Sequence, residues 1–320
     1  MKDYCTKSPV LFLIFNRPDT TKAVFEEIRN AKPPKLYIAA DGPRTNRLGE
    51  LDLCQQAIAV VNNIDWPCEV KTLYRNENLG CKEAVASAVT WFFDQEEEGI
   101  ILEDDCLPSK SFFKYCDTLL EKYRFDTRIR HITGCNLHFG TKWGEASVFF
   151  SRRTEVWGWA SWRRVWQDYD KNLSRHTEEE MREQLFKIFS DPFIVDSWMI
   201  AFNGVKKGEI DTWDYQLAIH NYLNNGLSVC PNVSLITNIG FRADATHSTN
   251  PNDRSANILL GEIDEITFPK DMISDTGADY AIAKHEFKLE EKWKEHNHPK
   301  KQFKRWIKSK FKSPSSQNNL

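Results

Sequence analysis

Short apolar runs alternate with amphipathic stretches along the first half of this 320-residue chain. Continuous apolar runs of this length are typical of strands that are buried on both faces of a sheet. The runs at residues 10–15, 36–40 and 99–102 predict strands, and residues 69–74 and 129–133 are further predicted strands that include polar side chains. The stretches between them predict helices over residues 20–30, 49–62, 82–95 and 111–123. Strands separated by helices indicate an α/β fold with a mostly parallel sheet flanked by helices.

The second half of the chain has a less regular pattern. Residues 143–170 are rich in aromatic side chains, and Thr177 with Glu180 forms the capping-box sequence of a following helix. A further helix is predicted over residues 215–223, after Asp214, and residues 227–230 predict a short strand. The chain length suits one large domain with a C-terminal elaboration.

Polar insertions stand where the first four predicted strands end. They are Asn16 with Arg17, Asp41, residues 76–80 and residues 103–105. In parallel sheets, the carboxyl ends of the strands meet along one edge, and ligands bind in the crevice there. We therefore expect these loops to surround one ligand site.

The acids Glu103, Asp104 and Asp105 form the most unusual of these insertions. Clustered carboxylates repel one another and lose hydration when an apolar strand holds them. One interpretation is that one acid caps the next helix while the others are solvated. The other is a site for Mg²⁺ or Mn²⁺, which prefer carboxylate oxygens, often together with substrate phosphates. A diphosphate-bearing substrate suits the second interpretation.

The other loops allow two interpretations each. Asp41 either opens a turn or accepts a hydrogen bond from a nucleobase N–H. Arg17 is either a surface cation or a ligand of a phosphate or a base. Gly80 is either a turn residue or lets backbone N–H groups approach a phosphate. The chain has neither GxGxxG nor GxxxxGK[ST], so neither a dinucleotide-binding site nor a P-loop is indicated.

Composition changes this picture at a few points. The formal net charge of −3 gives no reason to expect a nucleic-acid partner. The eight cysteines include no CxxC pair, which predicts mostly buried thiols in a reducing compartment. The apolar run at residues 10–15 is too short for a signal or membrane segment, so we expect a cytoplasmic location. The 11 Trp residues hint at carbohydrate, because exposed Trp rings stack on sugar faces.

Six short motifs carry a resemblance to a known family. In order, FNRP, ADGPR, NENLG, ILEDD, VWGWASW and TWDY resemble motifs of GT-A-type nucleotide-sugar glycosyltransferases, most nearly N-acetylglucosaminyltransferase I and its bacterial relatives. The resemblance covers residues 8–250 and implies a GT-A, Rossmann-like α/β domain with a C-terminal elaboration on the acceptor side. Residues 1–135 would be its nucleotide-sugar-binding half, residues 136–284 its acceptor-binding and catalytic half, and residues 285–320 a basic amphipathic tail.

The resemblance also implies roles for individual residues. Asp105 would hold Mn²⁺ or Mg²⁺ at the diphosphate, and Asp214 would be the catalytic base. Asp41 would contact the base, Asp104 the ribose and Glu103 the donor sugar. The residues that would bind the nucleotide sugar are Phe15, Asn16, Arg17, Asp41, Asn78, Gly80, Lys82, Glu103, Asp104, Trp159 and Trp213.

Two of the predicted site residues also have other interpretations. An inverting transfer needs a base for the acceptor hydroxyl, and Asp214 between Trp213 and Tyr215 would be partly desolvated, which makes a carboxylate a stronger base. Asp214 also suits the N-cap of the helix that follows it, and the two roles are compatible. His247 would be a second metal or phosphate ligand, with Asp244 as an alternative, or else an exposed loop histidine.

We therefore predict a metal-dependent inverting glycosyltransferase that moves a sugar from a UDP-sugar to a glycan or lipid-linked glycan hydroxyl in bacterial surface-polysaccharide assembly. The alternatives are a sugar nucleotidyltransferase and a non-catalytic sugar-binding protein of the same fold. Trp157, Trp159 and Trp162 would either stack on sugar rings or belong to the core. Residues 300–312 contain seven basic residues and no acid, so this tail is either a solvated helix or a peripheral anchor on an anionic membrane surface.

Overall fold

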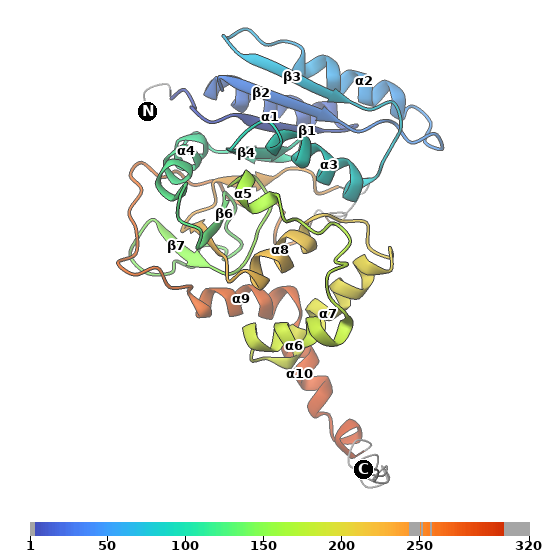
Figure 1. Cartoon of the computed structure of the whole chain (residues 1–320), viewed down its shortest axis with the longest axis vertical. Coiled ribbons are helices and arrows are strands. Elements are labelled where there is room, and N and C mark those ends of the chain that lie inside the picture. The colour runs from blue at the N-terminus through green and yellow to red at the C-terminus, as the bar shows by residue number, and fades with distance from the viewer. Residues whose placement is uncertain (1–3, 243–249, 251, 257, 304–320) are drawn as a thin grey trace.

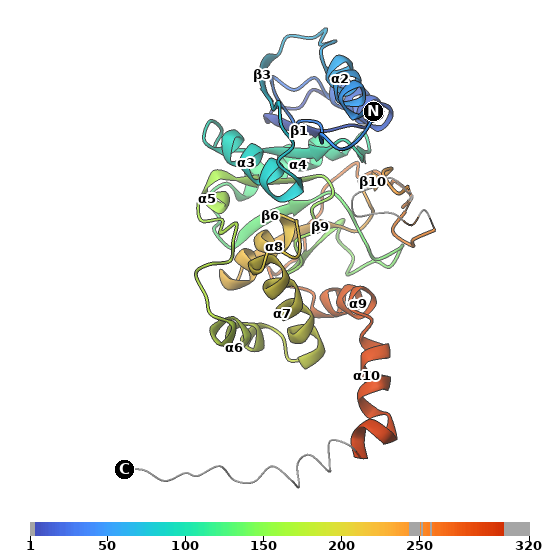
Figure 2. The same cartoon turned by 90° about the vertical axis from the view of Figure 1, so that its right-hand side faces the viewer.

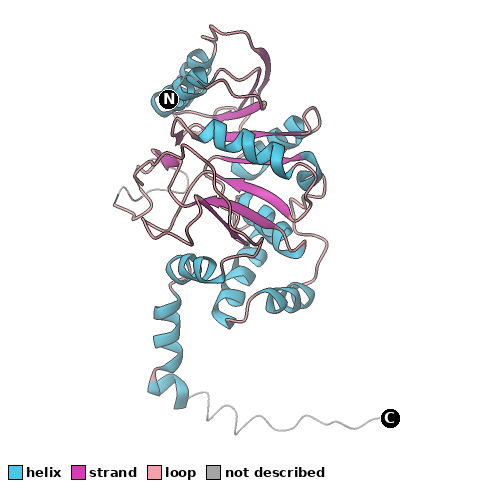
Figure 3. Cartoon of the chain, turned by 90° about the vertical axis from the view of Figure 1, so that its left-hand side faces the viewer, coloured by secondary structure: helices cyan, strands magenta, loops and turns pink. Residues whose placement is uncertain are grey.

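The computed structural model describes residues 4–242, 250, 252–256 and 258–303. In this part of the chain, eight strands form one sheet in the order β3-β2-β1-β4-β8-β6-β9-β7. The strands are β1 (Val10–Ile14), β2 (Lys35–Ala40), β3 (Glu69–Tyr74), β4 (Glu98–Glu103), β6 (Ile129–Thr133), β7 (Val148–Ser151), β8 (Trp159–Trp162) and β9 (Leu227–Pro231). Helices flank the sheet on both sides (Figure 3). The expected α/β fold with a mostly parallel sheet is confirmed.

The helices follow the order expected from the amphipathic stretches. They are α1 (Pro18–Ala31), α2 (Glu50–Val61), α3 (Cys81–Phe93), α4 (Phe112–Tyr123), α5 (Arg163–Trp166), α6 (Glu178–Ile188), α7 (Pro192–Lys206), α8 (Asp214–Leu223), α9 (Thr276–Glu286) and α10 (Leu289–Asn297). The predicted capping box is present at the start of α6, where Thr177 and Glu180 exchange hydrogen bonds. One boundary differs from expectation: Asp214, which suits the N-cap of the following helix, is instead the first residue of α8, and Trp213 is the N-cap.

The packing of β1 on both faces of the sheet explains its continuous apolar sequence. On one face of the sheet, its Leu11 and Leu13 pack in a cluster with Phe92 and Phe93 of α3. On the other face, Phe12 belongs to a cluster that includes residues of α1 and α4. Since both faces are covered, every side chain of the strand is buried. Burial of one such large apolar side chain stabilises the fold by about 2 kcal/mol.

The aromatic-rich stretch at residues 143–170 supplies β7 and β8. β8 lies between β4 and β6 and runs antiparallel to both, so that Trp159 stands opposite Ile101 of β4 and Thr133 of β6. β3, β2, β1 and β4 form a parallel block beside it. The sheet thus joins strands from both halves of the chain edge to edge.

A small second sheet brings a late segment beside the three acids. β5 (Cys106–Pro108) directly follows the acids and pairs antiparallel with β10 (Ile236–Asn238). In this register Asn238 stands opposite Cys106. The main chain continues the contact, since the Ile239 N–H donates to the carbonyl oxygen of Asp105 at 2.8 Å.

Helices α6, α7, α9 and α10 lie at the end of the molecule opposite β3 and α2, and α10 extends away from the body (Figures 1 and 2). Helices α6, α7, α8 and α9 share a second apolar cluster there. Residues 300–303 of the predicted basic tail are exposed, and residues 304–312 lie outside the described part of the chain. None of the helices in the described residues has the length and apolar character needed to cross a bilayer.

Candidate active site

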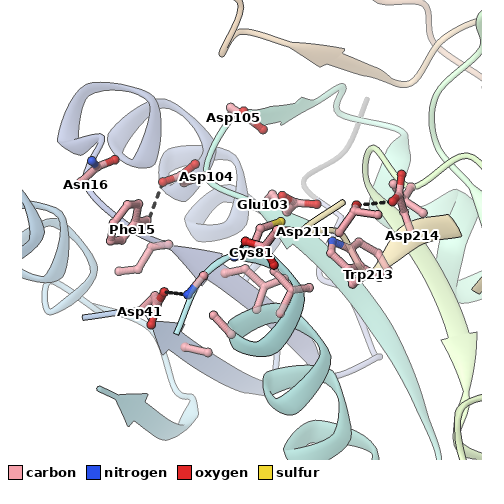
Figure 4. Close-up of a pocket in the computed structure, with 18 of the residues that line it drawn as sticks. Phe15, Asn16, Asp41, Cys81, Glu103, Asp104, Asp105, Asp211, Trp213 and Asp214 are labelled. Atoms are coloured by element: carbon pink, nitrogen blue, oxygen red, sulfur yellow. Dashed lines mark hydrogen bonds between the residues drawn. The ribbon is translucent and has the colours of Figure 1, made fainter. Parts of the chain in front are cut away.

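A cavity of about 530 Å³ lies at the carboxyl ends of β1, β2 and β4. The first turn of α3 and the loop before α8 complete its walls (Figure 4). All four polar loops contribute lining residues. The predicted site residues that line the cavity are Phe15, Asn16, Arg17, Asp41, Asn78, Gly80, Glu103, Asp104, Asp105, Trp213 and Asp214.

Three predicted site residues are not among the lining residues. Trp159 is 1% exposed in the core. Lys82 directs its ammonium to the side-chain oxygen of Asn172 at 3.0 Å. His247 lies outside the described residues, as does its alternative Asp244.

The wall beside β1 is built by a short connection into α1. Pro18 occupies the first turn of α1, a position where its missing N–H costs nothing and its fixed φ suits the helix. Only Phe15, Asn16 and Arg17 therefore separate the strand from the helix. The Asn16 amide donates to Glu50 at 2.9 Å, and the Arg44 guanidinium lies 5.4 Å from the centre of the Phe15 ring. Asn16 is thus already engaged within the wall.

Asp41, which follows β2, organises the loop after β3. Its carboxylate accepts hydrogen bonds from the Asn78 side chain at 2.9 Å, from the Leu79 N–H at 3.0 Å and from the Gly80 N–H at 3.2 Å. The close approach also explains Gly42, where a Cβ would lie 2.4 Å from the main chain of Glu77. Asp41 therefore organises the turn, as the first interpretation predicted. It also lines the cavity, which a contact with a nucleobase would require.

The three acids after β4 occupy three different surroundings (Figure 4). Asp104 is 8% exposed and accepts the Phe15 N–H at 3.1 Å. Asp105 pairs with Arg17 at 2.8 Å. Glu103, the last residue of β4, lines the cavity with neither of these partners. The three acids therefore differ in their hydrogen-bond partners, although their charges repel one another.

Burial and mutual repulsion disfavour the ionised forms of Glu103 and Asp104. Burial and repulsion from Asp105 and Asp104 raise the pKa of Glu103 well above its usual range. Burial and the neighbouring Asp105 raise the pKa of Asp104 to about 7. A positive group that entered the cavity would lower both pKa values by favouring the ionised carboxylates.

The Arg17–Asp105 pair is enclosed by the segment after β10. Asn238 approaches Asp105 with its side-chain amide at 3.4 Å. At Gly240, an added Cβ would lie 2.2 Å from Asp105 Oδ2 and 2.8 Å from Arg17 Nη1. Asn238 lines the cavity, although sequence reasoning did not identify it. Its only sequence signal is a polar residue after a short apolar run, and such positions are common.

The residues of the triplet suit a divalent cation only in part. Their oxygens are the ligand type that Mg²⁺ and Mn²⁺ prefer. Within the described residues, however, no group of three or more His, Cys, Asp or Glu side chains is arranged to hold a metal ion. The donor set therefore fits a cation that one or two carboxylates hold together with ligand phosphates, which is the usual manner of Mg²⁺ binding.

Asp214 lies on the opposite side of the cavity, at the first turn of α8 (Figure 4). The Thr212 hydroxyl and the Tyr215 N–H both donate to its Oδ1. The preceding Trp213 is 2% exposed, and its ring stacks on Trp159 with centroids 5.6 Å apart. These contacts fix the main chain on which Asp214 stands.

The aromatic stretch contributes one ring to the cavity. Trp157 is a lining residue, whereas Trp159 and Trp162 are almost fully buried. Trp159 and Trp162 are the first and last residues of β8 and face opposite sides of the sheet, and both are buried because an apolar cluster covers each side, whereas Trp157 precedes the strand. Of these three tryptophans, Trp157 is the one that lines the cavity, and the expected place of Trp159 at the ligand is wrong.

Arg75, which follows β3, is a further cavity residue that sequence reasoning missed. Its guanidinium donates to the Ser87 hydroxyl at 2.7 Å, and it forms no ion pair in the described part of the chain. By contrast, Arg17 and Arg44 are paired with Asp105 and Glu50. Burial lowers the pKa of Arg75. An arginine without a carboxylate partner in a cavity wall is suited to an anionic ligand.

Several solved structures are similar to this chain. No protein-family model and no curated protein match the chain. The chain is similar to a UDP-glucose pyrophosphorylase complexed with UDP-glucose, with 9% identity, a TM-score of 0.36 and coverage of 70% of this chain and 90% of that chain. HddC from Yersinia pseudotuberculosis has 10% identity and a TM-score of 0.31, with coverage of 51% and 80%. 4-Diphosphocytidyl-2C-methyl-D-erythritol synthase from Anaerococcus prevotii has 10% identity and a TM-score of 0.33, with coverage of 57% and 84%.

These structures do not support the specific resemblance to N-acetylglucosaminyltransferase I that the sequence motifs indicate. None of the three structures is N-acetylglucosaminyltransferase I, and each has a TM-score below 0.4. The interpretation of the cavity therefore depends on its own residues.

Proposed function

We propose that this protein is an inverting glycosyltransferase that moves a sugar from a UDP-sugar to the hydroxyl of a glycan or lipid-linked glycan. The observation that carries the proposal is the arrangement of one cavity. The acidic strand end and two arginines form one side, and Asp214 at the start of α8 forms part of the other. A nucleoside diphosphate sugar has the matching division between an anionic diphosphate and a neutral sugar that reacts.

Asp214 is the proposed base for the acceptor hydroxyl. Both of its hydrogen bonds go to Oδ1, from the Thr212 hydroxyl and the Tyr215 N–H. Oδ2 is thus the oxygen that would accept the proton, while Oδ1 holds the carboxylate in one orientation. Proton removal makes the acceptor oxygen a nucleophile, which attacks the anomeric carbon as the bond to the diphosphate breaks.

Arg75 is the proposed ligand of the diphosphate, because it lines the cavity without an ion pair in the described structure, and Arg17, which pairs with Asp105, would lie near the nucleotide as the resemblance implies. Asp105 would hold a divalent cation, which would stabilise the charge that develops on the departing diphosphate. On this side of the cavity, Asp104 would meet the ribose and Glu103 the donor sugar, as the resemblance implies. Trp157 supplies an aromatic face for a sugar ring.

The main alternative is a sugar nucleotidyltransferase, such as the UDP-glucose pyrophosphorylase found in the comparison. That reaction requires a nucleoside triphosphate, whose third phosphate needs further cationic or backbone N–H contacts. The connection from β1 to α1 is the short segment Phe15–Asn16–Arg17, and its sequence contains no glycine. We therefore place the glycosyltransferase first.

One experiment separates the candidates. Calorimetric titration with UDP, UDP-sugars and UTP, each with and without Mn²⁺, is followed by a donor-hydrolysis screen. The proposal predicts Mn²⁺-dependent binding of UDP and slow hydrolysis of at least one UDP-sugar. Pyrophosphate release from UTP with a sugar phosphate would instead establish the nucleotidyltransferase. Binding of sugars without hydrolysis or transfer would establish a sugar-binding protein.

A lipid-linked acceptor would place the protein at the cytoplasmic face of a membrane. Seven basic residues among residues 300–312 favour an anionic surface, and residues 300–303 are exposed at the far end of α10. Vesicles with and without phosphatidylserine test the proposal against a variant that lacks residues 300–320. Equal binding of the full chain and the truncated chain would refute a membrane role for the tail.

A further inference from the structure

We infer that Asp211 is a positioning residue that ties the loop before α8, which leads to the proposed base Asp214, to the first turn of α3 across the cavity. The inference rests on the proposed function, since it gives Asp211 a part in placing that base. Asp211 itself lines the cavity and is exposed to solvent.

The contact is made by both oxygens of the Asp211 carboxylate. Oδ2 accepts the Cys81 N–H at 3.1 Å, and Oδ1 accepts the Lys82 N–H at 3.1 Å. These are the first two residues of α3, whose N-cap residue Gly80 has no side chain for the purpose. The cap therefore comes from a segment about 130 residues further along the chain.

Gly80 permits this approach. Its φ of +81° is in the left-handed region, and an added Cβ would lie 2.8 Å from Asp211 Oδ2. On the other side of the same loop, Asp41 accepts the N–H groups of Leu79 and Gly80. Of the four consecutive N–H groups, those of residues 79 and 80 thus donate to Asp41, and those of residues 81 and 82 donate to Asp211 in the loop before α8.

The loop is also fixed at both of its ends. Near α7, the Ile210 N–H donates to the Gly204 carbonyl oxygen at 3.1 Å. Near α8, the Trp213 carbonyl oxygen accepts the Tyr169 hydroxyl at 2.9 Å. Asp211 lies between these anchors and adds the contact with α3 (Figure 4). Because Asp214 follows three residues later, we expect the contact with α3 to restrict the position of the base together with these anchors.

An ordinary helix cap provides the contrast. At the start of α7, Asp191 accepts the N–H of Phe193 at 2.8 Å, only two residues away. Asp191 therefore caps its own helix without joining distant segments. Asp191→Ala removes a carboxylate cap of the same kind away from the cavity, and it serves as the matched control for Asp211→Ala.

The test combines hydrogen exchange with kinetics in the full chain. In Asp211→Ala without ligand, we expect faster amide exchange in peptides that cover residues 210–216. We expect kcat for transfer to fall by about 10- to 100-fold, since a displacement of about 1 Å at a reacting group can cost that much. Donor KM should change by no more than about threefold, because Asp41 still holds residues 79 and 80. Asp211→Asn, which keeps one acceptor oxygen, should show smaller effects of the same kind.

The results decide between positioning and the other roles of a carboxylate. Asp191→Ala should leave the exchange of residues 210–216 and kcat unchanged. The inference is overturned if Asp211→Ala matches Asp191→Ala in both readouts, or if donor KM rises as much as kcat falls. If the wild-type protein transfers from no donor, the proposed function fails, and the exchange comparison alone decides whether Asp211 holds the loop.

Discussion

Replacement of His131 by Phe should make the stability of the fold less sensitive to acid. His131 on β6 is fully buried, and its Nε2 lies 2.8 Å from the carbonyl oxygen of Glu155, to which it donates. Its Nδ1 has no hydrogen-bond partner in the described structure. Protonation of Nδ1 would therefore bury both a charge and an N–H without an acceptor, which is strongly unfavourable.

The magnitude follows from the pKa. Burial lowers the pKa of His131 to about 4, from 6.5 in the unfolded chain. Between these values the unfolded state binds a proton that the native state does not, so the free energy of unfolding falls as the pH falls through this window. The full contribution is about 3 kcal/mol, of which about 2 kcal/mol is lost between about pH 7 and about pH 4.5.

Urea unfolding of the wild type and of His131→Phe at these two pH values measures the effect. At about pH 7 the variant should be less stable by about 1 kcal/mol, since the Glu155 carbonyl loses its donor. At about pH 4.5 the variant should be more stable than the wild type by about 1 kcal/mol, because it cannot bind the proton and so avoids the loss of about 2 kcal/mol. His138 and His220, whose pKa values burial also lowers to about 4, contribute equally to both proteins. A deficit that stays the same at both pH values would refute the reasoning, and the exposed His298→Phe serves as the control.

Three further predictions concern the cavity and the backbone beside it. Asp214→Asn should lower the transfer rate by at least about 100-fold and leave UDP affinity within about threefold, as rate assays and calorimetry would show; normal turnover would remove Asp214 from the mechanism. Asp105→Asn should abolish the increase in UDP affinity that Mn²⁺ provides, as measured by titration with and without the ion, and a retained increase would place the cation elsewhere. Gly158→Ala should cost about 3 kcal/mol in urea unfolding, since Gly158 has φ +59° and an added Cβ would lie 2.4 Å from Ile236 Cδ1. Gly208→Ala has φ +72° but no atom within 4 Å of the added Cβ, so it should cost only about 1 kcal/mol from backbone strain.

Strands β1, β2 and β4 of the parallel block could be predicted from the sequence because their apolar signal is local. A strand buried on both faces, such as β1, must be apolar at every position, and the run is visible without knowledge of its neighbours. The polar loops were equally predictable, since the carboxyl ends of parallel strands necessarily meet at one edge. For this reason Asp41, Arg17 and the three acids were expected around one cavity, and the structure places them there.

Other features depend on contacts that a local pattern does not contain. A tryptophan that fills the core and one that faces a cavity look alike in VWGWASW, so Trp159 was expected at the sugar although Trp157 lines the cavity. Asp211 was hidden for a related reason, because its partners are N–H groups at Cys81 and Lys82. Every residue except proline has such a group, and none leaves a mark in the sequence.

The place of β8 has a consequence for the order in which the chain can fold. β8 is made after β6 but lies between β4 and β6, so both of these strands have an unpaired edge until residues 159–162 arrive. Pairing over such sequence separations is slow, and unpaired edges favour association with other chains while they persist. A nascent chain that ends near residue 135 would contain all three acids and β1 on one edge of β4, but neither β8 on its other edge nor the opposite wall of the cavity. The binding site should therefore be among the last features to form, and a chaperone that covers the edge of β4 during synthesis would protect it.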